Sequence, residues 1–185
     1  INDFFSRNAI LKSLGEKNFK IITSIAMFYD LDNPNAITKE IKSVLAPDGL
    51  WCIQLSYLPS LLSNMNFYDV CHEHLLYYSL STLCTLMERN GLKIIDASTN
   101  DVNGGSLRIF VTHQESPVAP SARFKALLQE EKTLNLGRVE TYEAFFVKIL
   151  DLKKIVRSYL QKETSRGNTV IGLGASTKGN VLLQF

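Results

Sequence analysis

The densest group of reactive side chains is the run Cys71-His72-Glu73-His74, which contains two of the three histidines of the chain. It lies between a predicted strand and a predicted helix, at the carboxyl edge of an expected sheet, where open α/β folds bind ligands. Imidazole titrates near neutral pH, so a histidine here could move a proton, and Glu73 could orient a ring or raise its basicity. In an extended segment, His72 and His74 would point to one face. A polar loop whose histidines cap the next helix is the alternative interpretation.

The spacing in this run does not favour a metal site. It does not match HExxH, and the sequence has no CxxC pair that could add ligands. Asp30, Asp32 and Asn35 imitate a calcium loop, but Asn35 stands where that loop needs glycine and Ile41 where it needs glutamate. We therefore predict no metal ligands in this sequence.

A second candidate site is the glycine-rich run 172–180 (GLGASTKGN). It follows a predicted strand and opens a predicted helix, which aims backbone N–H groups at a phosphate. Thr177 stands where GxGxxG needs its third glycine, and Lys178 precedes Gly179 where a P-loop requires the reverse order. A phosphate-holding turn and a tight packing turn are both open interpretations. The candidate ligand residues are Gly174, Ala175, Ser176 and Lys178.

The hydrophobic pattern predicts an α/β fold. Runs 20–28, 50–56 and 92–97 are expected to be strands that lie as parallel neighbours, with 107–113 antiparallel beside the last. Helices are expected between the strands, on both faces of the sheet. One begins at Asn33-Pro34 and is ended by a turn at 47–49, and another begins after Ser79 and is stopped by Gly91. The glycine-containing loop between 99 and 106 joins the last two strands.

Beyond the sheet, the sequence predicts two further parts. Residues 117–166 begin at a Pro- and Ser-containing boundary and then show a charged helical pattern, typical of a helical linker. Residues 167–185 read as the first βα unit of another α/β domain, with a strand at 169–173 and a helix from Thr177. Residues 1–116 would then be the second half of a Rossmann-like domain. Because a βα unit is left unfinished and no Met opens the chain, we expect both ends to be cuts in a longer protein.

The bulk composition is that of a globular protein, with 45% hydrophobic and 21% charged residues. A net charge of +2 with dispersed Lys and Arg gives no electrostatic footprint for nucleic acid. No apolar run approaches the ~20 residues of a membrane span, so no membrane partner is expected. Three cysteines without a CxxC favour reduced thiols and a cytoplasmic location.

Three motifs together resemble one family, the sugar C-methyltransferases that make branched deoxysugars. They are Asp69–Leu75 (DVCHEHL, with Tyr-Tyr-Ser following), Asn100–Arg108 (NDVNGGSLR) and Gly174–Asn180 (GASTKGN). Many relatives carry Tyr where this chain has Cys71. Leu45–Gly49 (LAPDG) also resembles a turn that many methyltransferases share, which is a more general signal.

The resemblance implies a Rossmann-like methyltransferase sheet, S-adenosylmethionine as methyl donor and a nucleotide-linked keto-sugar as substrate. It also implies a zinc-binding domain and a glycine-rich donor-binding turn, both outside this sequence. By resemblance His74 is the base that removes a proton beside the ketone, Glu73 orients it or contacts a hydroxyl, and His72 is the third choice. Asn103 and Gly104 are expected to contact the substrate.

Two other functions are compatible with the sequence. A nicotinamide-dependent sugar oxidoreductase would need a complete GxGxxG, which this sequence does not contain. A non-catalytic nucleotide-sugar binding protein would keep its function when His74 is replaced.

Overall fold

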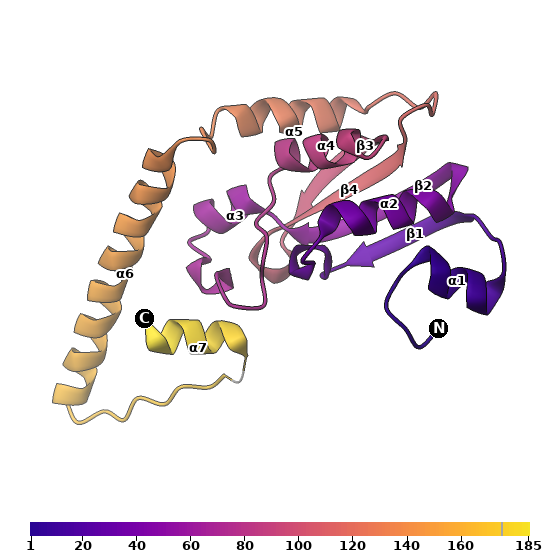
Figure 1. Ribbon diagram of the computed structural model, residues 1–185. Coiled ribbons are helices and arrows are strands. Elements are labelled where there is room, and N and C mark those ends of the chain that lie inside the picture. Colours follow the sequence, from indigo (N-terminus) through magenta and orange to yellow (C-terminus); the bar gives the residue numbers. More distant parts are fainter. Residues whose placement is uncertain (175) are drawn as a thin grey trace.

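The computed structural model describes residues 1–174 and 176–185 (Figure 1). In chain order its elements are α1 (Arg7–Leu14), β1 (Phe19–Ile25), η1 (Phe28–Asp30), α2 (Pro34–Val44), β2 (Leu45–Ser56), α3 (Leu58–Ser63), η2 (Phe67–Asp69), α4 (Leu80–Arg89), β3 (Leu92–Asn100), η3 (Val102–Gly104), β4 (Ser106–His113), α5 (Ala122–Lys132), α6 (Val139–Ser165) and α7 (Thr177–Gln184), where η denotes a 3-10 helix. The predicted α/β class is confirmed. None of these helices combines the length and apolarity that crossing a membrane requires.

The four strands form one sheet in the order β1-β2-β4-β3. β1 and β2 are parallel, whereas β4 is antiparallel to both of its neighbours, β2 and β3. The prediction that 92–97 lies directly beside 50–56 is therefore wrong. The connection through α4 leaves a gap one strand wide, and β4 returns from the hairpin into that gap.

Local sequence signals explain where the helices begin. The side chain of Asn33 accepts a hydrogen bond from the Ala36 N–H, and Pro34 occupies the first turn of α2. Ser79 and Thr82 form a reciprocal capping box at the start of α4. Both predicted helix starts are confirmed.

The prediction of a turn at 47–49 is wrong, because these residues lie within a strand. α2 ends at Val44 and β2 begins at the next residue, so 45–49 belong to the strand. The pairing of β1 with β2 jumps from Phe19–Leu45 to Ile21–Leu50, which places the extra residues in an irregularity of the ladder.

The hydrophobic core lies on one face of the sheet. Trp51, Ile53 and Ile109 are fully buried there, against α2, α4 and α5, which lie together along the sheet (Figure 1). On the opposite face of edge strand β1, Ile21 and Ile25 are 71% and 52% exposed. The expectation of helices on both faces is thus not met within the described residues.

The region expected as a helical linker contains two helices rather than one. α5 packs against β3 and α4, and Arg123 at its start pairs with Asp96 of β3. The 27-residue α6 extends away from the sheet, and Ile149 is the buried residue along it (Figure 1). The proposed domain boundaries near 116 and 166 follow the ends of β4 and α6, and they stay a prediction.

The strand predicted at 169–173 does not form. These residues lack regular secondary structure, and Ile171 and Leu173 are almost completely exposed. A strand needs a partner for its backbone groups, and no described strand lies beside this segment. The helix expected from Thr177 is present as α7, whose first turn is capped by Ser176.

Candidate functional site

Asp69 is the centre of the candidate site. It ends η2, and only 3% of its surface is exposed. Its backbone carbonyl accepts a hydrogen bond from Nδ1 of His74 at 2.8 Å, and its carboxylate Oδ1 lies 2.5 Å from Nζ of Lys178. One residue thus joins the His-Glu-His motif to the glycine-rich motif, which is more than one hundred positions away in the sequence.

The hydrogen bond to Asp69 determines which nitrogen of His74 is free. A carbonyl oxygen can only accept, so Nδ1 of the neutral ring must carry the proton. Nε2 then holds an unshared electron pair, as a general base requires. The Tyr29 ring meets the imidazole edge to face at 4.6 Å between centroids and limits its rotation.

His72 and Glu73 lie differently from His74. The His74 N–H donates to the Cys71 carbonyl at 3.2 Å, which closes a turn over the two residues between them. The segment is therefore not extended, which is the condition under which His72 and His74 would point to one face. The His72 and Glu73 side chains are 82% and 57% exposed, with Nε2 and Oε1 4.0 Å apart. The contact that orients His74 comes from Asp69.

Burial shapes the acid–base character around His74. It raises the pKa of Tyr29, and the negative charges of Asp30 and Asp69 add to this effect. Burial also raises the pKa of Tyr77, whose hydroxyl donates to the Asp69 carbonyl at 3.5 Å. For Asp30, burial raises the pKa and the nearby His74 opposes the shift. The phenols of Tyr29 and Tyr77 therefore stay protonated at neutral pH and can act as hydrogen-bond donors.

The glycine-rich motif approaches this site through α7. The Ser176 hydroxyl accepts from the Gly179 N–H at 3.3 Å and keeps its own proton for a further partner. The Lys178 side chain is 33% exposed. No atom of the described residues beyond its chain neighbours lies within 4 Å of the position that a Cβ would take at Gly174, so their packing does not require glycine there. Ala175, also predicted as a ligand residue, lies outside the described residues.

A cavity of about 480 Å³ separates the two motifs. Val70, Cys71 and His72 line one side, and α7 lines the other through Thr177 and Asn180. Cys71 is a half-buried free thiol in this wall.

The hairpin loop reaches the same region through Asn66. The Gly104 carbonyl accepts from the amides of Asn66 and Asn64, at 2.7 and 2.8 Å, and the Tyr68 hydroxyl donates to Asn66. The Asp69 N–H in turn donates to the Asn66 carbonyl. Asn103 lies in the exposed part of this loop with a left-handed backbone (φ 54°).

The structure therefore brings together Gly104, His74 and Lys178 through two intermediaries, Asn66 and Asp69. Neither residue is among those that the sequence predicts for the site. Asp69 carried a signal because it opens the DVCHEHL motif. Asn66 carried none, because its importance comes from the fold of a loop 38 residues away.

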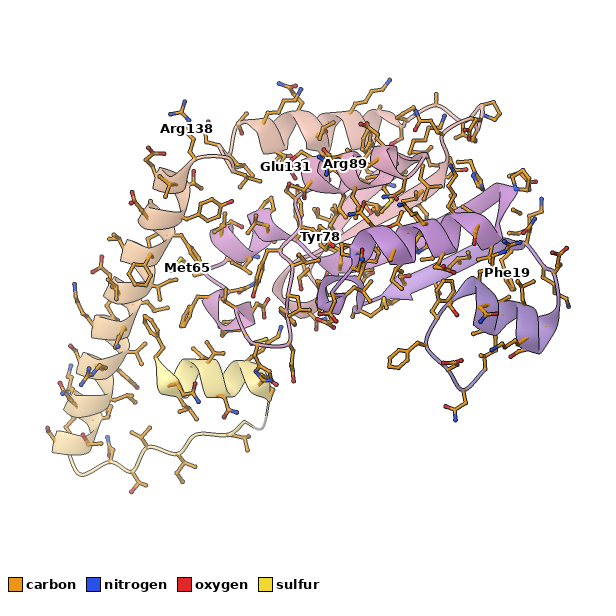
Figure 2. All side chains as sticks on the ribbon, in the orientation of Figure 1. Phe19, Met65, Tyr78, Arg89, Glu131 and Arg138 are labelled. Carbon is orange, nitrogen blue, oxygen red and sulfur yellow. The ribbon has the colours of Figure 1, made fainter. Side chains whose placement is uncertain are left out.

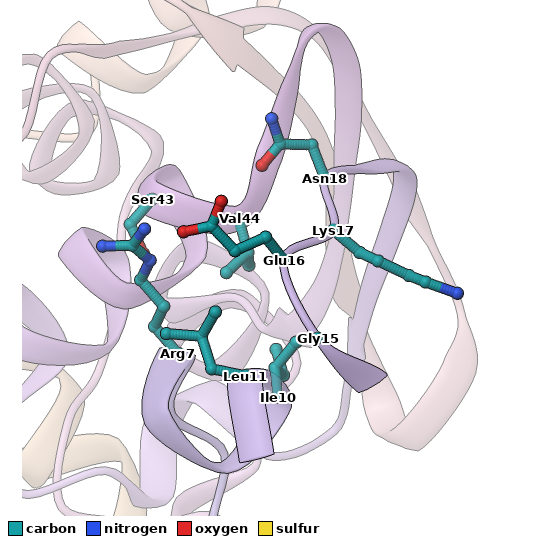
Figure 3. A pocket seen from close by; sticks show the side chains of 9 residues that line it. All are labelled: Arg7, Ile10, Leu11, Gly15, Glu16, Lys17, Asn18, Ser43 and Val44. Atoms are coloured by element: carbon teal, nitrogen blue, oxygen red, sulfur yellow. The ribbon is translucent and has the colours of Figure 1, made fainter. Parts of the chain in front are cut away.

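Another cavity, of about 410 Å³, lies at the opposite end of the sheet (Figure 3). Arg7, Glu16 and Ser43 are among its lining residues, and α1 and α2 form its walls. It contains no residue that the sequence predicts to be functional. In the described residues, no three His, Cys, Asp or Glu side chains gather as metal ligands would.

S-adenosylmethionine would need partners for its carboxylate, ribose and adenine. β1 is an edge strand whose outer side chains Ile21 and Ile25 face open space, so the surface beside it is not an enclosed pocket. The described residues alone do not fit the donor. Only the proton transfer can therefore be derived from them.

Sequence comparison decides the family. Residues 3–97 match the methyltransferase domain family, and residues 101–185 match the C-methyltransferase C-terminal domain. The chain belongs to the C-methyltransferases. This confirms the family that the three motifs predicted. C-methyltransferase NovU of Streptomyces niveus is 33% identical over 156 residues, which are 84% of this chain and 37% of NovU. The chain thus spans little more than a third of the length of this relative.

Solved methyltransferases show a partial likeness. The methyltransferase in complex with the Trm112 activator of Haloferax volcanii is 13% identical, with a TM-score of 0.45 over 53% of this chain and 55% of that one. The mitomycin 7-O-methyltransferase MmcR is 12% identical, with a TM-score of 0.42 over 52% and 30% of the two chains. The family assignment rests on the sequence matches.

Proposed function

We propose that the full-length protein is an S-adenosylmethionine-dependent methyltransferase that methylates a carbon beside a ketone in a nucleotide-linked deoxysugar. The observation that carries this proposal is the hydrogen bond from His74 Nδ1 to the Asp69 carbonyl, which leaves Nε2 free to take a proton. The match to a C-methyltransferase C-terminal domain supports carbon as the methylated atom.

The residues of this chain would perform the step that precedes methyl transfer. An unactivated C–H bond is not nucleophilic, but a carbon beside a ketone can lose a proton and become an enolate. Nε2 of His74 takes that proton. The electron pair of the broken C–H bond then becomes part of the enolate. The resulting imidazolium keeps its Nδ1–H bond to Asp69, now as a charge-assisted contact, which favours the protonated ring. Glu73 is exposed and can contact a sugar hydroxyl.

The glycine-rich motif would hold the nucleotide part of the substrate. The Ser176 hydroxyl has a free proton, and Lys178 adds a positive charge near the first turn of α7. The open space around Gly174 favours a close approach by a ligand over a packing role. We assign Asn103 and Gly104 to the sugar side, since their loop is tied to the same region. Three free cysteines fit a cytoplasmic enzyme.

The test is the turnover number of the full-length His74→Asn enzyme. Asparagine keeps a polar side chain but cannot act as a base, so turnover should fall by about 10²–10⁴-fold. Substrate affinity should change little, because the lost interaction belongs to the transition state. His72→Asn is the matched control, because it makes the same substitution two residues away. It should keep most of the turnover. A large loss in His72→Asn, with little in His74→Asn, would move the base to His72.

The same experiment distinguishes the proposed enzyme from a non-catalytic binding protein. A non-catalytic nucleotide-sugar binding protein would show no methyl transfer in the wild type, and His74→Asn would leave binding intact. The family membership already argues against a nicotinamide-dependent oxidoreductase.

A further inference from the structure

The carboxylate of Asp69 is unusual among the charged groups of this chain. Its Oδ1 is buried, and among the described residues the Lys178 ammonium is the donor group that lies against it. The Lys178 ammonium, 2.5 Å away, is the positive charge that compensates it. A buried charge without a partner is costly, so this carboxylate depends on that lysine to remain buried.

The two residues come from separate elements, and their surroundings differ. Asp69 lies in η2, while Lys178 lies in the first turn of α7 and remains 33% exposed. A second contact holds the elements together, since the rings of Phe67 and Phe185 are 5.4 Å apart. If the ion pair were lost, this apolar contact would therefore still hold α7 in place. The residue whose environment changes most would be Asp69, which would lose its compensating charge.

The main chain of Asp69 also holds the base. Its carbonyl accepts from His74 Nδ1, and the Cys71 N–H donates to the same oxygen at 3.1 Å. Asp69 is the last residue of η2, which is only three residues long and has few backbone contacts to resist a shift. We therefore expect a carboxylate that moves out to water to displace the Asp69 carbonyl as well. The state of the Asp69 side chain is thereby linked to the proton position on His74.

We propose that Asp69 and Lys178 form a positioning pair, in which Lys178 keeps Asp69 buried and the Asp69 carbonyl holds His74 in its Nδ1–H form. The functional meaning of this pair rests on the proposed role of His74 as the base. Its structural content concerns only the tautomer and can be measured without substrate or donor. Lys178 is then part of the machinery that prepares the base, in addition to any contact with a phosphate.

The pair predicts an asymmetry between its two single variants. Lys178→Met removes the compensating charge and leaves a buried carboxylate unpaired, so Asp69 should turn outward. Asp69→Asn removes the buried charge itself, and the partly exposed lysine can be hydrated instead. Adding Asp69→Asn to Lys178→Met should therefore restore the geometry that Lys178→Met disturbs.

The experiment is ¹⁵N NMR of the full-length protein labelled at histidine, at pH 8, with the His74 signal assigned by its loss in His74→Asn. The wild type should show the Nδ1–H form. In Lys178→Met the ratio of Nδ1–H to Nε2–H should fall roughly two- to tenfold, which matches one hydrogen bond of ~0.5–1.5 kcal/mol. The double variant should return to within about twofold of wild type.

Lys154→Met is the matched control, because it removes a lysine from the exposed pair with Asp151 on α6. It should leave the ratio unchanged. An unchanged ratio in Lys178→Met would overturn the proposal, as would a double variant no better than Lys178→Met, which would mean that the lysine acts by another route. A wild type without the Nδ1–H form would overturn it as well. Absence of methyl transfer alongside the expected NMR results would refute the proposed function and leave the positioning pair standing.

Discussion

Glu131 holds together three elements that surround the core, and its replacement gives the sharpest stability prediction. This residue of α5 is 4% exposed and lies against the start of α4 (Figure 2). Its carboxylate accepts from the N–H groups of Leu80 and Ser81, at 2.6 and 2.8 Å, and from the Tyr57 hydroxyl at 2.8 Å. A carboxylate at a helix N-terminus satisfies otherwise unpaired N–H groups, and its negative charge interacts favourably with the positive end of the helix dipole.

The magnitude follows from those three hydrogen bonds. Glu131→Gln keeps the shape but can offer only one acceptor oxygen, so at least one backbone donor loses its partner. A hydrogen bond to a charged group contributes ~1.5–3 kcal/mol, and we expect Glu131→Gln to destabilise α4 by about that amount. Glu131→Ala removes all three acceptor contacts and should cost about twice as much.

Amide hydrogen exchange across α4 in the full-length protein measures this effect. Exchange at Leu83 and Leu86 should accelerate roughly ten- to a hundredfold in Glu131→Gln. Glu130→Gln is the matched control, since Glu130 is the exposed neighbour on the same helix. Equal exchange in the two variants would refute the claim that the Glu131 carboxylate caps α4.

Two further predictions concern Tyr78 and Gly104. The Tyr78 hydroxyl is buried and has no hydrogen-bond partner among the described residues. Burial raises its pKa to about 12, above the ~10 of an unfolded tyrosine, so the free energy of unfolding should be independent of this group below pH 10 and should fall as the pH rises from 10 to 12. Tyr78→Phe should raise stability by about 1–2 kcal/mol and remove that part of the alkaline loss in thermal unfolding from pH 8 to 12; an unchanged alkaline profile would count against it. Gly104→Ala should destabilise the hairpin by about 1–3 kcal/mol, because φ is +82° and a Cβ would lie 2.4 Å from the Asn66 amide. Gly137→Ala meets nothing within 4 Å and should be nearly neutral in the same unfolding assay, and equal losses in the two alanine variants would contradict this account.

The sequence predicted the elements well where the signal is local. Asn33 and Ser79 mark helix starts because each side chain caps its own helix, and Leu107, Ile109 and Val111 mark the buried face of β4. The order of the strands in the sheet does not follow from local sequence signals. Nothing in 106–113 indicates whether it lies outside 92–100 or between that strand and β2. The missing strand at 169–173 has the same cause, because a β-branched run forms a strand only beside a partner.

The candidate site shows a similar division. The sequence predicts His74 and Lys178 as site residues because both belong to compact motifs rich in polar residues, and both stay predictions. The Asp69 carbonyl that holds His74 is a backbone atom, and backbone atoms have no residue type to read. The turn over His72 and Glu73 was missed as well, because periodicity alone cannot distinguish a turn from an extended loop.

Solvent deuterium exchange at the substrate carbon tests the central claim most directly. The full-length enzyme would be incubated in D₂O with a nucleotide-linked keto-sugar and an analogue of the methyl donor that cannot transfer a group. The account predicts deuterium incorporation beside the ketone in the wild type and in His72→Asn, and a loss of about 10²–10⁴-fold in His74→Asn. Exchange that persists at the wild-type rate in His74→Asn would show that another group removes the proton.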